Sequence, residues 1–509
     1  MLGVAQPQPI VQRPLRGGPL VWATVLAVAV AGYGIGLASG RSELLLAAGL
    51  VVAVPLVFAW RLEAGVLLLV LVRPSLDLFA DRTLASYHGV ALNPASVFAV
   101  LVIAVGAPYM IERWRLLRRA PSIYPYLLFA GIAMIGVSVA AATGPAVTEW
   151  MRLCAVLVTY ALAYLAVNSP AAVARLLAAI VASAVVPAAV GIGQWATNST
   201  QAIGDLNRAT GTFLQPDPYG IYLAVVTVAA LALVFAARGP WRWLALAVGA
   251  MTGMALVLSY TRTGWVMVVL GALVLGIARY RVLLVLVPVA IVIAFVALPG
   301  VQSRVQSVSQ QQEVQYGTGD SFHTRVELWR QNLPKAEQKP LTGLGLGSIV
   351  QETDTAAHVH SDYVRALVET GVFGFLAFVW LLLSAAVGSA FAMRWARRSG
   401  SVPLRAAAVA GFAAAVAYIL ASGDSNLMTQ SSVSGAAWAL MGCAHAAGTI
   451  GRDRVAPRPL PAARARRARL LGAVGVAAYR PGTSAETGSE AGKVSSRAWS
   501  SSSSPFSGR

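Results

Sequence analysis

The chain has 509 residues, of which 57% are hydrophobic and 12% charged, whereas soluble domains average roughly 45–50% and 25%. Many stretches of about 20 residues carry no charge, and that length crosses a bilayer core, so the composition excludes an ordinary soluble enzyme. The apolar runs are continuous, whereas a transmembrane β-barrel alternates apolar and polar residues. The expected fold class is all-α: a polytopic transmembrane helical bundle of about 12–14 spans with one long extracytoplasmic loop.

The net charge of +19 comes mainly from arginines in short loops and in the C-terminal tail. This pattern marks cytoplasmic loops, so the membrane is an expected partner and nucleic acid is not. Cys154 and Cys443 both fall in apolar segments, so no disulfide framework is expected. Arg13 and Arg16 precede the first apolar run, which lacks a small-residue cleavage site at its end. We therefore expect a first span there and not a removed signal peptide.

In chain order, a cytoplasmic segment at 1–19 precedes eleven expected spans within 20–298. These spans lie at 20–39, 44–60, 64–72, 93–110, 124–142, 150–167, 171–195, 218–236, 243–258, 265–277 and 282–298. Residues 299–362 form the large extracytoplasmic loop, and three spans within 363–450 follow, at 363–392, 406–421 and 433–450. Residues 451–509 read as a basic, disordered cytoplasmic tail.

Basic loops predict the orientation of the spans, because cytoplasmic loops carry an excess of lysine and arginine. If residues 113–119 are cytoplasmic, the count of spans puts every later basic cluster on the same side. Both termini are then cytoplasmic. The loops that fall outside are those at 196–217, 259–264, 299–362 and 422–432.

Polar side chains are concentrated in these predicted outer segments. Arg208, Arg262 and Arg325 lie in the first three. The last part of the large loop runs into an apolar span and contributes five further ionisable residues. They are His358, His360, Asp362, Arg365 and Glu369. Charges at the head of a span are costly unless they are paired or face water, so these residues are functional candidates.

Several candidates also have a purely structural interpretation. Arg208 and Arg325 fit solvated loop charges. Arg365 and Glu369 are four residues apart and can pair on one helix face. Asp362, or Ser361 before it, fits a helix N-cap.

Two further patterns suggest ligands less strongly. His358 and His360 could bind a metal, but the chain has only 5 histidines and no suitably spaced cysteine or histidine partners, so no metal is expected. Gly343, Gly345 and Gly347 loosely resemble a phosphate-binding loop, but a turn before a helix is the favoured interpretation.

A series of short motifs within 194–383 resembles the O-antigen ligase and Wzy-type polymerase superfamily of bacterial cell envelopes. The motifs are, in order, Arg208-x-x-Gly-Thr-Phe-x-x-Pro, the Thr261-Arg262 turn, Arg325-x-x-x-Trp, Pro340-Leu-x-Gly-x-Gly-x-Gly, and His360-x-Asp-Tyr-(x)5-Glu-x-Gly-(x)2-Gly. The family usually has asparagine where this chain has Ser361.

The resemblance implies a glycosyltransferase without a metal or other cofactor, spanning the inner (plasma) membrane of a bacterial cell. Its donor would be a glycan on an undecaprenyl-type pyrophosphate, and its acceptor a hydroxyl of a glycan, lipid or protein. Arg208 and Arg262, with Arg325 and Arg365 as secondary candidates, would bind the pyrophosphate. His360 would be the base that activates the acceptor, supported by Glu369, Asp362 and His358.

Three classes of function stay open at this point. Within the enzyme class, the resemblance does not separate ligases, polymerases and protein O-glycosylating enzymes. The main alternative is a transporter or flippase of lipid-linked glycan, although the chain shows no matching pair of spans broken by glycine or proline, which transporters often have. A non-catalytic assembly subunit is the third.

Overall fold

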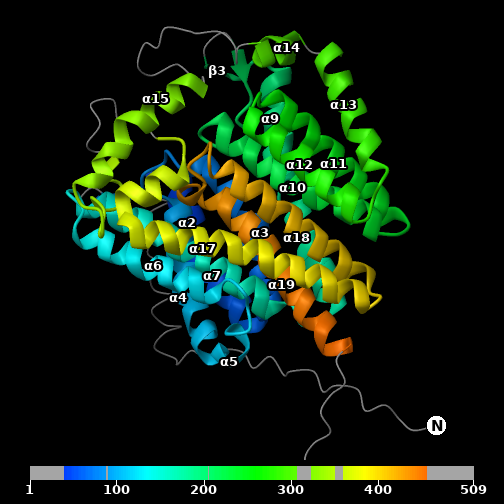
Figure 1. Ribbon diagram of the computed structural model, residues 1–509, viewed down its shortest axis with the longest axis horizontal. Helices are drawn as coiled ribbons and strands as arrows, with labels where there is room; N and C mark the ends of the chain where they lie inside the picture. Colours follow the sequence, from blue (N-terminus) through cyan, green and yellow to red (C-terminus); the bar gives the residue numbers. More distant parts are fainter. Residues whose placement is uncertain are drawn as a thin grey trace, which may run out of the picture. The chain divides into compact units, whose positions relative to one another are not determined.

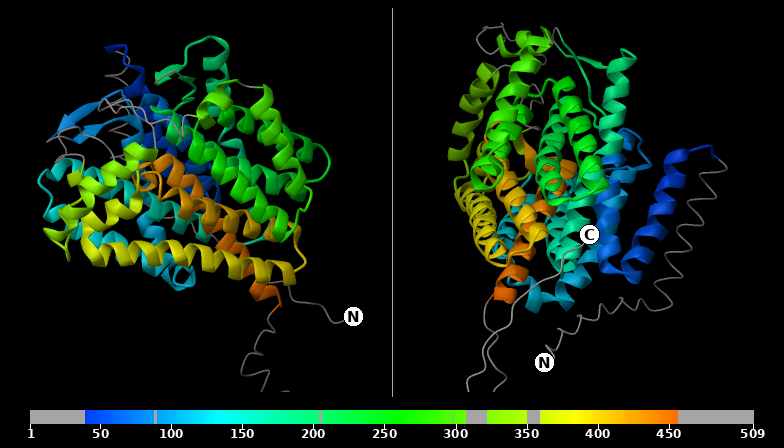
Figure 2. Two further views of the ribbon diagram at one scale, coloured as in Figure 1. Left: turned by 45° about the horizontal axis from the view of Figure 1, so that its top comes forward. Right: turned by 90° about the vertical axis from the view of Figure 1, so that its right-hand side faces the viewer.

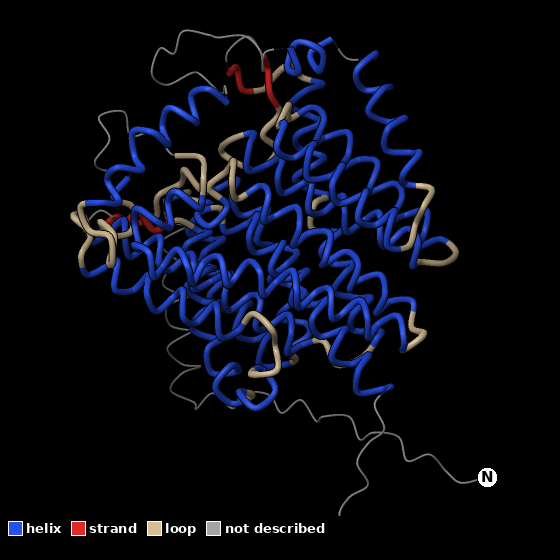
Figure 3. Tube along the Cα trace, viewed as in Figure 1, coloured by secondary structure: helices blue, strands red, loops and turns tan. Residues whose placement is uncertain are grey.

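The computed structural model describes most of the chain, namely residues 39–87, 90–203, 206–297, 299–306, 322–349 and 359–455. Within these ranges the regular structure is helical except for two short antiparallel hairpins, β1 (Ala85–Tyr87) with β2 (Val90–Leu92) and β3 (Gln201–Ile203) with β4 (Leu206–Arg208). Figure 3 shows both hairpins in red among the helices. The all-α prediction is confirmed. The predicted segment at 1–19, the first span up to residue 38, His358 and the tail beyond 455 lie outside the described residues.

The helices follow the predicted apolar segments, and each predicted span in the described part of the chain contains one or two of them. In order they are α2 (Ser42–Trp60), α3 (Leu62–Val72), η1 (Arg73–Phe79), α4 (Pro94–Glu112), α5 (Trp114–Leu117), α6 (Ile123–Ser138), α7 (Thr143–Ala166), α8 (Pro170–Ala182), α9 (Val185–Ala196), α10 (Pro216–Ala236), α11 (Pro240–Leu258), α12 (Arg262–Ala278), α13 (Leu283–Ala297), α14 (Pro299–Gln306), α15 (Phe322–Asn332), η2 (Leu333–Glu337), α17 (Asp362–Arg398), α18 (Val402–Ala421), η3 (Leu427–Thr429) and α19 (Ser431–Val455).

Eight helical segments among the described residues are long and apolar enough to cross a membrane, and α6, α12 and α13 are shorter apolar helices. The third predicted span corresponds to α3, which has only 11 residues. At 1.5 Å per residue it measures roughly 16 Å, about half the thickness of a bilayer core. It therefore does not cross alone, and the chain continues directly into η1.

Three long helices from the C-terminal half form the centre of the packing. α17, α18 and α19 contact one another, and α7 and α10 pack against them, as Figure 1 and Figure 2 show. Small residues allow these close approaches: a Cβ on Gly411 would lie 2.3 Å from the Cβ of Ala444, and one on Gly448 would lie 2.6 Å from that of Ala392. Such contacts replace hydrophobic burial as the source of helix association in lipid.

Helix α17 is broken near its start by a glycine-rich loop. Gly371 has φ 68° and ψ −173°, and the helix resumes after it. The break frees backbone groups, and the loop that follows η2 binds them. Val372 N–H donates to Pro340 O at 2.8 Å, while Leu344 N–H donates to Val368 O at 2.9 Å. The freed polar groups are therefore satisfied without water, as a membrane interior requires.

Gly371→Ala should destabilise the protein, because the observed backbone angles are essentially restricted to glycine and cost about 1–3 kcal/mol otherwise. A Cβ there would also lie 2.4 Å from Leu341 O. The matched control is Gly131→Ala within α6, where a Cβ meets nothing within 4 Å; this change should be neutral or gain up to about 1 kcal/mol. Thermal unfolding in detergent measures both, and equal melting temperatures would contradict the assigned role of Gly371.

Candidate functional site

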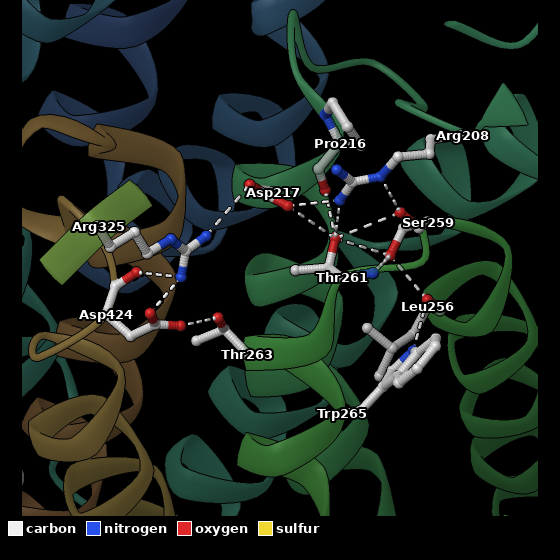
Figure 4. A network of polar contacts seen from close by, with 10 residues as sticks. All are labelled: Arg208, Pro216, Asp217, Leu256, Ser259, Thr261, Thr263, Trp265, Arg325 and Asp424. Atoms are coloured by element: carbon white, nitrogen blue, oxygen red, sulfur yellow. Dashed lines mark hydrogen bonds and ion pairs between the residues drawn. The ribbon is translucent and has the colours of Figure 1, made fainter. Parts of the chain in front are cut away.

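Four of the predicted outer segments meet in one polar cluster. The cluster takes residues from β4, from the start of α10, from the α11–α12 turn, from α15 and from the α18–α19 connection. Figure 4 shows Arg208 and Arg325 with the aspartates and threonines of the cluster, and Asp217 lies between the two arginines. We call this set the outer cluster: Arg208, Asp217, Ser259, Thr261, Arg262, Thr263, Arg325 and Asp424.

Arg208 forms the buried side of the outer cluster, with only 1% of its surface exposed. Its Nε donates to Ser259 O at 2.8 Å, and its Nη2 donates to Asp217 Oδ1 at 2.5 Å and to Thr261 Oγ1 at 3.2 Å. Thr261 Oγ1 in turn donates to Pro216 O at 2.9 Å. The Arg208 guanidinium therefore holds the α11–α12 turn against the start of α10.

Arg325 forms the other side of the outer cluster, on α15. Its Nη1 donates to Asp424 O at 2.9 Å and forms an ion pair with the Asp424 carboxylate, while its Nη2 lies 3.9 Å from Asp217 Oδ2. Thr263 Oγ1 donates to Asp424 Oδ2 at 2.6 Å. The two carboxylates thus connect segments that are far apart in the sequence.

Arg262 is the first residue of α12 and is half-buried. It lies between Thr261, which contacts Arg208, and Thr263, which contacts Asp424. Arg208 and Arg325, with Asp217 and Asp424, therefore lie on either side of the turn that carries Arg262. Guanidinium groups gathered in this way suit an anionic ligand such as a phosphate.

His360 is attached to the same α18–α19 connection that supplies Asp424. Ser361 N–H donates to Asn426 Oδ1 at 3.1 Å, and Asp362 N–H donates to Ser422 O at 2.8 Å. The fully buried Asp362 carboxylate accepts from Leu427 N–H at 3.0 Å and from Met428 N–H. These bonds fix Ser361 and Asp362 to the connection that supplies Asp424, and His360 directly precedes them in the chain.

His360 itself is half-buried and has a φ of +50°, in the left-handed region that few non-glycine residues adopt. Strained residues of this kind often occur at functional sites. Ser361 is the N-cap of α17, because its Oγ accepts from Val364 N–H at 3.5 Å. Of the two cap residues considered from the sequence, the structure selects Ser361.

Arg365 and Glu369 lie in a separate buried network that crosses from α17 to α7. Arg365 Nε donates to Glu369 Oε2 at 2.9 Å, and its Nη2 lies 3.4 Å from Glu149 Oε2. Glu149 Oε1 also accepts from Arg152 at 2.8 Å. The pairing expected from the four-residue spacing is present. With two carboxylates around it and 7% of its surface exposed, Arg365 is held mainly by the protein itself.

Sequence reasoning missed four partners of these side chains. Asp217 and Asp424 lie in predicted outer loops, where a lone carboxylate gives no signal that sets it apart from a solvated charge. Glu149 and Arg152 lie at the edge of a predicted span, where the same rule on intramembrane charge would have marked them. No group of three or more histidine, cysteine, aspartate or glutamate side chains that could hold a metal occurs among the described residues.

Comparison with known families finds a match for the part of the chain that carries five of the eight outer-cluster residues. Residues 247–379 match the family model of the O-antigen ligases, Wzy_C. This match to about a quarter of the chain supports the O-antigen ligase superfamily. The matched part includes Arg262, Arg325 and His360, and Arg208 precedes it. No curated protein matches the chain.

The match to the O-antigen ligase family model fits the rest of the structure. Together with the eight apolar helices in the described ranges, it indicates a multi-pass bacterial membrane protein. The family match supports membrane glycan transfer of the O-antigen ligase kind in general.

Proposed function

We propose that this protein transfers or polymerises a glycan from an undecaprenyl-type pyrophosphate carrier onto an acceptor hydroxyl at the outer face of the membrane. The observation that carries the proposal is the meeting of four predicted outer segments in one cluster that contains arginines. The α18–α19 connection of this cluster also binds Ser361, the residue after His360. Such a cluster suits a diphosphate leaving group, and the histidine suits removal of a proton near neutral pH.

In the proposed reaction the acceptor oxygen attacks the anomeric carbon of the donor sugar. The bond from that carbon to the diphosphate oxygen breaks, and the diphosphate leaves with the electron pair on its lipid carrier. His360 takes the proton of the acceptor hydroxyl, so the attacking oxygen does not develop a positive charge. Attack opposite the leaving group inverts the anomeric centre.

The arginines have different roles in this proposal. Arg262 lies at the α11–α12 turn and Arg325 lies on α15 in the predicted large loop. Both would contact the negative charge that develops on the diphosphate. Arg208 and Arg365 remain members of the predicted binding set, but their contacts with Asp217 and with Glu369 favour a positioning role. Asp217 and Asp424 would hold the guanidinium groups in orientation before the donor arrives, which reduces the cost of reorganisation.

An apolar cavity offers a place for the carrier lipid in this proposal. It has a volume of about 610 Å³, is open, and is lined by side chains of α6, of the loop after η2 and of the first half of α17, among them Leu128, Leu341, Phe373 and Trp380. An isoprenoid chain needs such a surface at the membrane, within a few helical turns of the headgroup site.

The test is a purified protein reconstituted with a lipid-pyrophosphate glycan and an acceptor. The expected result is consumption of the donor, formation of a product linked to the acceptor, and release of the lipid pyrophosphate. Omission of the acceptor should stop the consumption. Movement of the donor across the bilayer without consumption would support a transporter and reject the enzyme. The product length then separates repeated from single transfer.

A further inference from the structure

A second cavity, with two arginines in its lining, lies along the C-terminal half of α17, far from the outer cluster. Gly388 and Phe391 of α17 line this cavity. They follow Asp362, the first residue of α17, by 26 and 29 positions. At 1.5 Å per residue this separation is roughly 40 Å, about the full thickness of a bilayer with its headgroups. The cavity is therefore at the level of the opposite leaflet, which the basic loops predict to be cytoplasmic.

Charged and aromatic side chains from three elements line this cavity, which has a volume of about 230 Å³. Arg119 comes from the connection between α5 and α6, and Arg452 comes from the last turns of α19. Phe391 and Trp395 of α17 form an apolar wall, and His445 and Thr449 of α19 complete the lining.

A chain of hydrogen bonds fixes the orientation of His445, which lines the cavity. Ser122 N–H donates to the Tyr160 hydroxyl at 3.2 Å, which lies 2.9 Å from His445 Nδ1, and His445 Nε2 lies 3.2 Å from Ala385 O. Because a carbonyl only accepts, Nε2 carries the hydrogen, and Nδ1 accepts from Tyr160. Both ring nitrogens of His445 are therefore bonded within the protein. An anion in the cavity would be held by the arginines.

The surroundings give the cavity a positive character. The Asp453 carboxylate lies 3.7 Å from Arg452 Nε and offsets one of the two lining charges. The neighbouring basic residues lie on the same connections and helix ends: Arg115, Arg118, Arg394, Arg397 and Arg398. Paired guanidinium groups match the oxygens of a phosphate.

The apolar wall points to a lipid as the source of that phosphate. Phe391 is 57% exposed on a helix that spans the membrane, so its ring is available to acyl chains. Trp395, one turn further on, is half-buried and lies near the level where tryptophan favours the membrane–water interface. Basic pockets between spans on the cytoplasmic side are typical sites for anionic lipid headgroups.

We propose that the cavity between Arg119, Arg452 and the α17 aromatics binds the phosphate headgroup of an anionic phospholipid in the leaflet opposite the glycan site. Its location in the described bundle makes it independent of the outer cluster. A bound lipid would tie together the α5–α6 connection, α17 and α19, so it would stabilise the folded protein by mass action.

The experiment follows thermal unfolding of the purified full-length protein in a neutral detergent with added lipid. Phosphatidylglycerol should raise the melting temperature by a few degrees, whereas phosphatidylcholine and inorganic phosphate at the same concentration should not. The variant R119Q/R452Q should lose this shift. The control R115Q/R397Q removes two charges of neighbouring turns that do not line the cavity, and it should keep the shift.

Two outcomes would overturn the proposal. One is a full phosphatidylglycerol shift in R119Q/R452Q, and the other is an equal shift with inorganic phosphate, which would indicate a free-anion site. If the double variant does not fold, R119Q alone serves, because Arg119 is exposed on a short connection. It should weaken lipid binding roughly tenfold or more, the loss expected for a hydrogen bond to a charged group, and unchanged binding would reject the site.

Discussion

His360→Ala should abolish glycan transfer and leave the protein folded and inserted. A positioned general base contributes about 10²–10⁴-fold to the rate. In the proposed reaction the His360 imidazole is the base that takes the acceptor proton. Because the backbone of His360 is in the left-handed region, alanine also introduces strain there. His360→Asn separates the two effects, since asparagine tolerates this conformation but is not a base.

Both variants are best compared in a strain that carries only this copy of the gene, with surface glycan and protein level measured together. The expected result is loss of the glycan at a normal protein level for alanine and for asparagine alike. Activity above a tenth of the original in His360→Asn would contradict the assignment of the base. If His360→Asn kept its activity while His360→Ala lost it, the activity would depend on the backbone conformation at this position and not on proton transfer.

The sequence predicted the helices well because the signals are local. Continuous apolar stretches mark the spans, Ser361 stands one residue before a helix, and Arg365 and Glu369 have helical spacing. Each of these features depends on neighbours within a few positions. For the same reason the break in α17 was not predicted: its apolar pattern continues past Gly371, and the loop that fills the break comes from residues 340–347.

The outer cluster was predicted only in part, because its partners are far apart along the chain. Arg208, Arg262 and Arg325 were chosen for their charge and predicted side. Thr263 and Asp424 are 161 positions apart, and Ser361 and Asn426 are 65 apart. No spacing rule connects such pairs. The carboxylates that orient the arginines come together only through the packing of α10, α12, α15 and the α18–α19 connection.

Replacing Arg365 with leucine should destabilise the protein by about 3–5 kcal/mol, the cost of leaving a buried charge without its partner. Glu369 has only 2% of its side chain exposed and would lose its ion pair, and Glu149 would lose one of two. Because α17 begins two residues after His360, at Asp362, activity should fall together with stability. Arg41→Leu is the control, since that side chain is 39% exposed and its loss should change the melting temperature little.

The double variant Arg365→Leu with Glu369→Gln decides between two roles for Arg365. If the arginine mainly neutralises the buried carboxylates, the second change removes the unpaired charge and should recover most of the lost stability, because Glu149 keeps Arg152. Activity should then recover in parallel, as the helix regains its position. If stability recovers while transfer stays absent, Arg365 acts on the substrate directly and belongs in the pyrophosphate-binding set. Thermal unfolding and donor consumption, measured on the same preparations, distinguish these results.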